Sequence, residues 1–230
     1  MKELAFSEHY GRSKMVVTRL TLLASVLLLM SFVVLVGNAQ VSVADCAKGF
    51  IEITPKISAC GFTLTRSGKL TQEGQVLVDP LISSYVEGAN GTKPNIAGKV
   101  VLFPVSSSGR FRVLQVCDGP DTRAMCATVF VFDKRTAQLH PADAGHYGPE
   151  RWQSWSSDER HVVLVDRSEG AGWLHIIDPT NGKTRDFPNP RSNENWTVQP
   201  ETLRWTSSNS FTIRVKPCER CHTARRRIRF

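Results

Sequence analysis

The 230-residue sequence lacks the short motifs that mark several common classes of enzyme. It has no Gly-x-Ser-x-Gly nucleophile elbow, no His-Glu-x-x-His zinc motif and no glycine-rich phosphate loop. It also lacks a long amphipathic helical pattern after residue 40. These absences favour a β-rich fold and a non-enzymatic function. An enzyme with an unrecognised site remains an alternative.

Acidic residues are fewer than basic ones. The chain has 29 Lys and Arg against 21 Asp and Glu, a formal net charge of +8. Much of the excess lies near the C-terminus, at Lys216, Arg220, Arg225, Arg226, Arg227 and Arg229. A basic surface attracts anionic partners over long range, although the same charge also serves solubility. The expected export of the chain argues against nucleic acid as its partner.

The N-terminal region has the layout of an export signal. Basic residues up to Arg19 precede an uncharged apolar run, Leu20 to Gly37, and small residues follow at 37–39. Residues 1–39 are expected to be a signal peptide, or alternatively a membrane anchor, because 18 apolar residues approach the length that spans a bilayer. Both alternatives place residues 46–230 outside the cytoplasm, periplasmic or extracellular. Membrane contact is expected only through residues 20–37, if uncleaved, and Met15 is an alternative start to Met1.

The six cysteines all follow the apolar run. An even number of cysteines in an exported chain favours disulfides. Six cysteines permit fifteen pairings. The simplest is the local one, in which each pair flanks a short segment: Cys46–Cys60, Cys117–Cys126 and Cys218–Cys221.

A pattern of about 50 residues recurs three times. Residues 155–165 read Trp-Ser-Ser-Asp-Glu-Arg-His-Val-Val-Leu-Val, and residues 105–115 and 205–215 repeat the order of anchor, polar turn and β-rich run. Such a period indicates stacked supersecondary units. It predicts an all-β fold of antiparallel meanders, with three repeat units in 105–230 and an N-terminal β region in 46–104 that resembles a degenerate fourth. Residues 83–98 and 188–200 are expected to form loops.

The central copy resembles the WD40-like repeat of TolB-type β-propellers. The matching residues are Trp155, Ser156, Asp158, Arg160, Asp178 and Gly182, whereas Ser157 replaces the usual Pro and Glu159 the usual Gly. The match is centred on residues 155–187. The resemblance implies blades of four strands around an axis, up to four and not necessarily a closed ring, and a protein partner. We therefore expect an exported or membrane-anchored, propeller-like binding or scaffold domain of the cell envelope, without a cofactor.

The segment Cys218-Glu219-Arg220-Cys221-His222 matches the haem-attachment pattern. It gives the main alternative function, a monohaem c-type cytochrome in which Cys218, Cys221 and His222 hold haem c. The repeat argues against haem, because this segment corresponds to the turn that carries Cys117 and Cys126. A redox-active pair is a further alternative, but the usual βαβ context is absent. A structural disulfide is preferred.

Other candidate residues are weaker. His140, Asp143, His146 and Glu150 are of metal-ligand types, but their spacing fits no established signature, so a plain loop without metal is preferred. His161 and His175 lie in predicted strands and are expected to be edge or packed residues. Because Trp155 and Trp205 recur at one place in the repeat, they are expected to be core anchors. Trp196 lies in a predicted loop and is the candidate for surface recognition.

Overall fold

The computed structural model describes residues 42–88, 91–121, 124–144, 149–168, 171–188, 196–218 and 220–230. These residues belong to one compact unit that begins at Val41. The apolar run at residues 20–37 and His146 lie outside the described residues. Within them, no helix is both long enough and apolar enough to cross a membrane.

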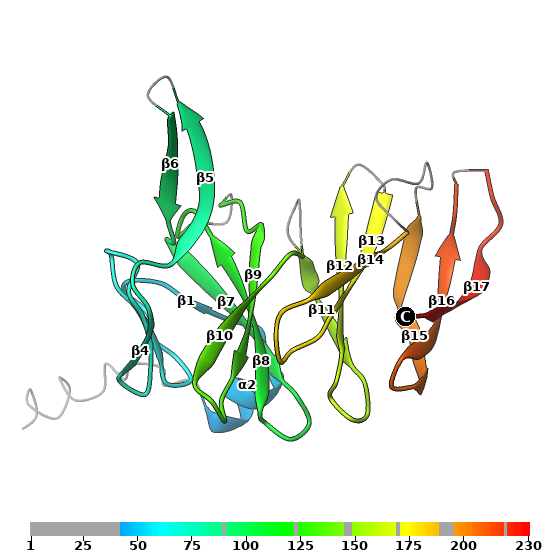
Figure 1. Cartoon of the computed structure of the whole chain (residues 1–230), viewed down its shortest axis with the longest axis horizontal. Helices are drawn as coiled ribbons and strands as arrows, with labels where there is room; N and C mark the ends of the chain where they lie inside the picture. The colour runs from blue at the N-terminus through cyan, green and yellow to red at the C-terminus, as the bar shows by residue number, and fades with distance from the viewer. Residues whose placement is uncertain are drawn as a thin grey trace, which may run out of the picture. The chain divides into compact units, whose positions relative to one another are not determined.

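The described chain is all-β apart from one short helix, α2 (Val43–Lys48), and its sheets are antiparallel. Ser42 caps this helix with a capping box, in which Ser42 Oγ accepts from the Asp45 backbone N–H and the Asp45 carboxylate accepts from Ser42. Figure 1 shows the strands following one another along the chain from sheet to sheet.

Three sheets succeed one another in sequence order. The first sheet contains β1 (Ile51–Ile53), β7 (Lys99–Val105), β8 (Phe111–Cys117), β9 (Thr128–Asp133) and β10 (Gln138–Ala142). The second contains β11 (Pro149–Trp155), β12 (Val162–Ser168), β13 (Ala171–Ile177) and β14 (Thr184–Phe187). The third contains β15 (Thr197–Ser207), β16 (Ser210–Lys216) and β17 (Ala224–Arg229). The strands β7, β11 and β15 directly precede the polar turns of the three repeat copies, and β1 joins the first sheet from further upstream.

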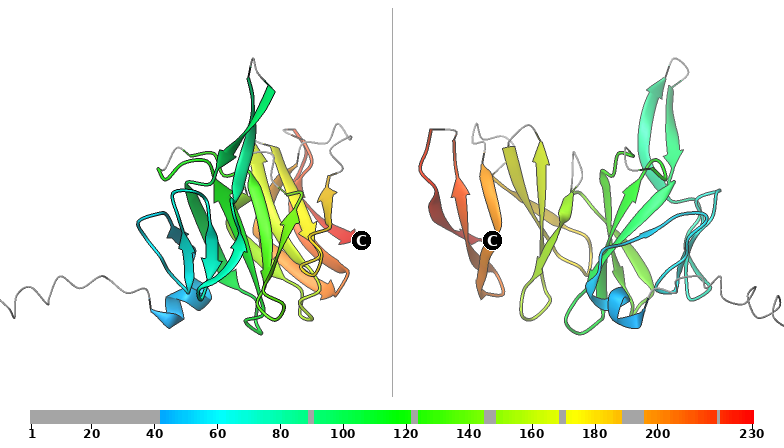
Figure 2. Two further views of the ribbon diagram at one scale, coloured as in Figure 1. Left: turned by 60° about the vertical axis from the view of Figure 1, so that its left-hand side comes forward. Right: turned by 180° about the vertical axis from the view of Figure 1, so that it is seen from behind.

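Two smaller elements precede and flank the first sheet. The N-terminal sheet contains β2 (Phe62–Leu64), β3 (Leu70–Gln72) and β4 (Gln75–Val78). Strands β5 (Ile82–Gly88) and β6 (Gly91–Ile96) pair in a two-stranded hairpin that projects from the sheets in every view (Figure 2). The expected loop over residues 83–98 is therefore wrong, because cross-strand pairing orders a segment of low apolar content.

In two of the three copies the sequence repeat corresponds to the same turn, whereas in the third copy a shorter turn joins β15 to β16 and Ser207 pairs with Ser210. Ser106 N–H donates to Phe111 O at 2.8 Å, and Ser156 N–H donates to His161 O at 2.9 Å. The fourth residue of each turn has a positive φ, 74° at Gly109 and 57° at Glu159. This left-handed conformation favours glycine, the residue found in the first of the two turns. Glu159 adopts the same conformation although it carries a side chain.

Successive sheets are held together by apolar residues on their facing sides. Val113 and Val131 of the first sheet pack with Leu164 of the second. Val163 and Ile176, on the other side of the second sheet, pack with Phe211 of the third. Strands β8 and β12 are covered on both faces, which explains the continuous apolar run at 162–165. A further cluster joins the first sheet to the N-terminal sheet.

The structure contains three disulfides, Cys46–Cys60, Cys117–Cys126 and Cys218–Cys221. They are the local pairs that the sequence favours. The second lies between β8 and β9, and the third lies between β16 and β17, so the two occupy equivalent connections in their sheets. Three disulfides indicate an oxidising compartment, as expected for an exported protein.

Candidate functional site

The outer half of the β5–β6 hairpin exposes large side chains. Tyr85 is 69% exposed and Val86 50% exposed. The base of the hairpin is fixed, because Ser83 Oγ donates to Asn95 O at 3.0 Å and Thr128 Oγ1 of β9 donates to Ser83 O. A two-stranded hairpin is marginally stable in water without further packing. The hairpin is thus anchored at its base, whereas Tyr85 and Val86 further along β5 are exposed.

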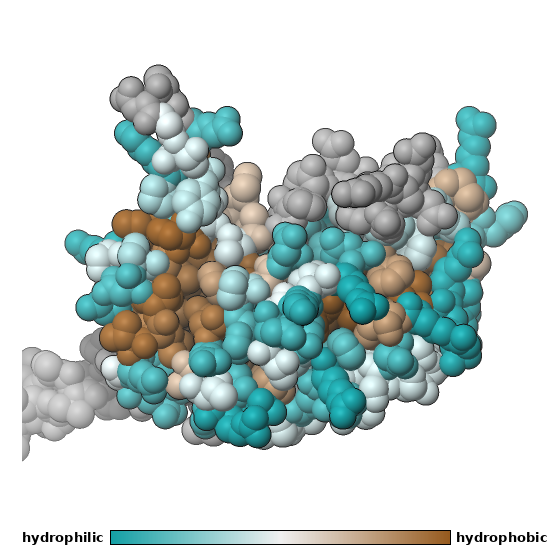
Figure 3. All heavy atoms as spheres, viewed as in Figure 1, coloured by the Kyte–Doolittle hydropathy of each residue, from teal (hydrophilic) through white to brown (hydrophobic). Residues whose placement is uncertain are grey.

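Apolar residues continue below the hairpin. Ile96 is 44% exposed at the end of β6, and Val76 of β4 is 53% exposed. Figure 3 shows apolar side chains gathered below the hairpin on this side of the molecule. Here β4 and β10 contact each other, and Leu77, Val78 and Leu139 are only partly buried. Tyr85 and Val86 follow one another in β5 and therefore lie on opposite faces of the hairpin. We call the exposed residues Val76, Tyr85, Val86 and Ile96 together the apolar surface.

A groove adjoins the apolar surface at Ile96. Its volume is about 370 Å³, and its walls also include Pro55, Ala97 and Pro120. Lys56 and Arg66 contribute basic side chains to the same groove. Exposed apolar side chains that gather in this way mark protein-binding surfaces, and tyrosine is enriched at such interfaces. In the described chain β5 and β6 are each paired on one side only, so each also offers a strand edge.

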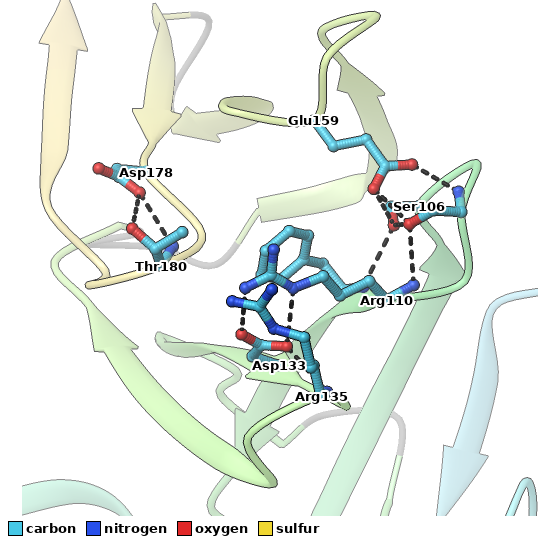
Figure 4. A network of polar contacts seen from close by, with 9 residues as sticks. Ser106, Arg110, Asp133, Arg135, Glu159, Asp178 and Thr180 are labelled. Carbon is cyan, nitrogen blue, oxygen red and sulfur yellow. Dashed lines mark hydrogen bonds and ion pairs between the residues drawn. The ribbon is translucent and has the colours of Figure 1, made fainter.

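A second, polar group of residues lies at the repeat turns (Figure 4). The Glu159 carboxylate accepts from Ser106 Oγ at 3.0 Å, and from the backbone N–H and Oγ of Ser108. Burial raises the pKa of Glu159, but these hydrogen bonds and the nearby Arg110 outweigh it, so the pKa lies below its ordinary value. Glu159 therefore links the turn of the second sheet to that of the first.

The other charges in this group are also paired. Arg110 donates to both oxygens of Asp133, at 3.0 and 2.7 Å, and this bidentate contact lowers the pKa of Asp133. Asp178 accepts from the backbone N–H and Oγ1 of Thr180, at 2.9 and 2.7 Å. These carboxylates hold turns and sheets in place.

A larger groove of about 600 Å³ runs beside the β13–β14 turn. Its polar walls include Asp143, His161, Asp178 and Lys183. Asp178 is occupied by its turn, and His161 Nδ1 lies 2.9 Å from Ser208 O of the third sheet. Two of the polar groups that line this groove, Asp178 and His161, are thus engaged in local hydrogen bonds.

His175 forms a buried cluster with two carboxylates. Its Nδ1 lies 2.7 Å from Asp186 Oδ1 and its Nε2 lies 3.7 Å from Asp166 Oδ2. His175 is 2% exposed and Asp166 is fully buried. Burial lowers the pKa of His175, but Asp166 and Asp186 outweigh burial and raise it to about 9. His175 and Asp166 are buried, whereas the Asp186 side chain is 23% exposed, so the cluster reaches the surface only through Asp186.

Several residues singled out in the sequence lie elsewhere than expected. Trp196 is not a surface recognition residue: it is 6% exposed, and its backbone carbonyl accepts from Gly172 N–H at 2.6 Å. The bridge to Gly172 carries the indole into the apolar layer between the second and third sheets. By contrast, Trp155 and Trp205 are partly buried and pack against the apolar clusters, stacked on Phe111 and edge-to-face on Phe211 respectively.

The structure also shows the state of the cysteine and histidine motifs. Cys218 and Cys221 form a disulfide, so neither sulfur is available for a thioether, and His222 is exposed beside them. Glu150 forms an ion pair with Arg167 at 3.2 Å. Among the described residues, no three His, Cys, Asp or Glu side chains are arranged to hold a metal ion.

Comparisons with known proteins give little beyond this geometry. No family model matches the chain, and no curated protein matches it. Among solved structures, the chain is similar to Kuenenia stuttgartiensis hydrazine synthase, with a TM-score of 0.32 and 12% sequence identity. That match covers 66% of this chain and 50% of the other chain, so this protein spans half the length of that structure.

Proposed function

We propose that this protein is an exported, propeller-like binding domain of the cell envelope, without catalytic activity, whose partner is another protein. The partner contacts the apolar surface at the β5–β6 hairpin. The observation that carries the proposal is the exposure of Tyr85, Val86 and Ile96 on one projecting hairpin. Such residues lose their contact with water when a partner covers them.

Further support comes from the order of the sheets. The second sheet has four antiparallel strands in sequence order, as a propeller blade does. Its neighbours pack against both of its faces. The three disulfides are consistent with a cell-envelope location.

The proposal is tested by photo-crosslinking in the cells that make the protein. A benzophenone amino acid replaces Tyr85 in one variant and Lys134, an exposed residue of the β9–β10 turn, in a control variant. We expect a discrete crosslinked protein at position 85 and none at position 134. Absence of a specific product at position 85 would contradict the proposal.

Binding is then measured with the purified crosslinked partner. We expect Tyr85→Ser to weaken binding at least tenfold, because truncating a central aromatic anchor costs about 1.4 kcal/mol or more. The matched control Lys134→Ser should leave binding unchanged. Equal affinities of the Tyr85→Ser variant and the unaltered protein would assign the partner to another surface.

A further inference from the structure

The two faces of the third sheet differ sharply in character. Phe211, Ile213 and Val215 of β16, with Ile228 of β17, are buried against the second sheet. On the opposite face lie Arg214 and Lys216 of β16 and three arginines of β17. Arg204 of β15 lies beside Thr212 on the same face. We call this set the basic face: Arg204, Arg214, Lys216, Arg225, Arg227 and Arg229.

The strand register places these cations close together. Arg214 pairs directly with Arg225 across β16 and β17, and Thr212 pairs with Arg227. Alternate residues of a strand lie about 7 Å apart, so the arginines of β17 form a regular row. Like charges directly opposite one another destabilise a sheet. Folding alone therefore gives no reason for the Arg214–Arg225 pair.

Little negative charge compensates the basic face. The described residues from 196 to 230 contain eight Lys and Arg side chains and one carboxylate, Glu201. Among the described residues, no ion pair joins the basic face to a carboxylate. Arg225, Arg227 and Arg229 are exposed, and hydrophilic side chains cover this end of the molecule in Figure 3.

We propose that the basic face binds the surface of an anionic phospholipid bilayer. Its cations spread over three adjacent strands, which suits an extended array of phosphate groups. Arginine is well matched to phosphate through its planar, multiply donating guanidinium group. Surface cations of this kind bind anionic leaflets, and the attraction adds up over the cations involved.

The residues of the basic face favour a bilayer over nucleic acid as the anionic partner. Single-stranded nucleic acid is usually held by aromatic side chains that stack on bases. The residues that share this face with the cations include Thr197, Gln199 and Thr212, and none of the described ones is aromatic. The disulfides also indicate a compartment without nucleic acid.

The test measures binding of the full chain to vesicles. One set contains phosphatidylcholine alone, and the other contains phosphatidylcholine with phosphatidylglycerol, at 0.1 M salt. Neutral vesicles report any contribution of the apolar run at residues 20–37, so the ratio of the two partition coefficients isolates the charge effect. We expect a strong preference for the anionic vesicles, reduced at high salt because screening shortens the range of the attraction.

Paired variants assign the effect to the basic face. Each cation near an anionic leaflet strengthens binding about fivefold, so Arg225→Gln with Arg227→Gln should lower the preference about 25-fold. Lys56→Gln with Arg66→Gln removes the same charge elsewhere and should lower it less than about threefold. Arg225→Lys with Arg227→Lys should retain it. Tyr85→Ser should also retain it, because the apolar surface takes no part, which separates this proposal from the proposed function.

The following results would overturn the inference. The first is equal partition into neutral and anionic vesicles. The second is an equal loss in the glutamine variant and its charge-matched control. The third is loss of binding in the lysine variant or displacement by millimolar inorganic phosphate, which would indicate a discrete guanidinium–phosphate site. The fourth is tighter binding to a poly-glutamate peptide or a single-stranded oligonucleotide than to the vesicles.

Discussion

The buried His175 cluster predicts an unusual dependence of stability on pH. The carboxylates of Asp166 and Asp186 overcome the burial of the imidazole and raise its pKa from 6.5 to about 9. Because the folded-state pKa exceeds the unfolded one, the stabilisation by the protonated ring is fully present below pH 6.5. It is lost as the pH rises through about 9.

The size of the effect follows from the shift. A rise from 6.5 to about 9, at 1.36 kcal/mol per pKa unit, corresponds to about 3 kcal/mol. Solvent screening takes little from this value, because His175 is only 2% exposed. That amount is a large part of the stability of an ordinary domain.

The assay compares the unaltered protein with His175→Gln by urea unfolding at pH 6 and pH 9.5. Subtracting the two proteins removes the titration of groups they share. We expect the difference in unfolding free energy to shrink by about 3 kcal/mol between the two pH values. A constant difference would refute the reasoning, as would an imidazole pKa below 6.5 measured for His175 by NMR. Asp186→Asn should give an intermediate result, because Asp166 remains.

Three further changes test other parts of the fold. Gly182→Ala should destabilise the protein by at least about 3 kcal/mol in urea unfolding. Gly182 has a φ of +75°, and an added Cβ would lie 2.0 Å from Pro141 O. A change below about 1 kcal/mol would contradict the packing of this turn. Glu159→Gln should cost about 1–2 kcal/mol at pH 7 and nothing at a pH where the carboxylate is already protonated. Equal losses at both pH values would exclude a role for its charge. Removing the disulfide with Cys46→Ala and Cys60→Ala should cost about 3 kcal/mol, given a sequence separation of 14; an unchanged unfolding midpoint would contradict this.

Much of the fold could be predicted from local pattern. The β-rich run at the end of the central repeat copy, residues 162–165, lies in β12. Such strands carry their own signal, in buried β-branched residues and flanking turns. The β5–β6 hairpin carries none of comparable strength, because Ser, Gly, Asn and Pro dominate it.

Contacts between residues far apart in the sequence could not be predicted from local pattern. Asp166 and Asp186 lie 9 and 11 residues from His175, and only the register of three strands makes them neighbours. Trp196 is surrounded in sequence by polar residues, yet its bridge to Gly172 takes it inside. The charges of the basic face could be read from the sequence, but their gathering on one side of a sheet required the pairing of β16 with β17.

The pairing of β1 with β7 has a consequence for the order of assembly. The other strands of the first sheet pair with strands that follow closely, whereas Ile51 of β1 pairs with Leu102 of β7. At 5–20 residues per second, synthesis from the N-terminus delivers that partner roughly 3–10 s later. During that interval β1, an apolar strand, has no partner strand in the first sheet. The nascent chain therefore passes through a period in which β1 is open to wrong partners, and factors that shield emerging chains would act at this step.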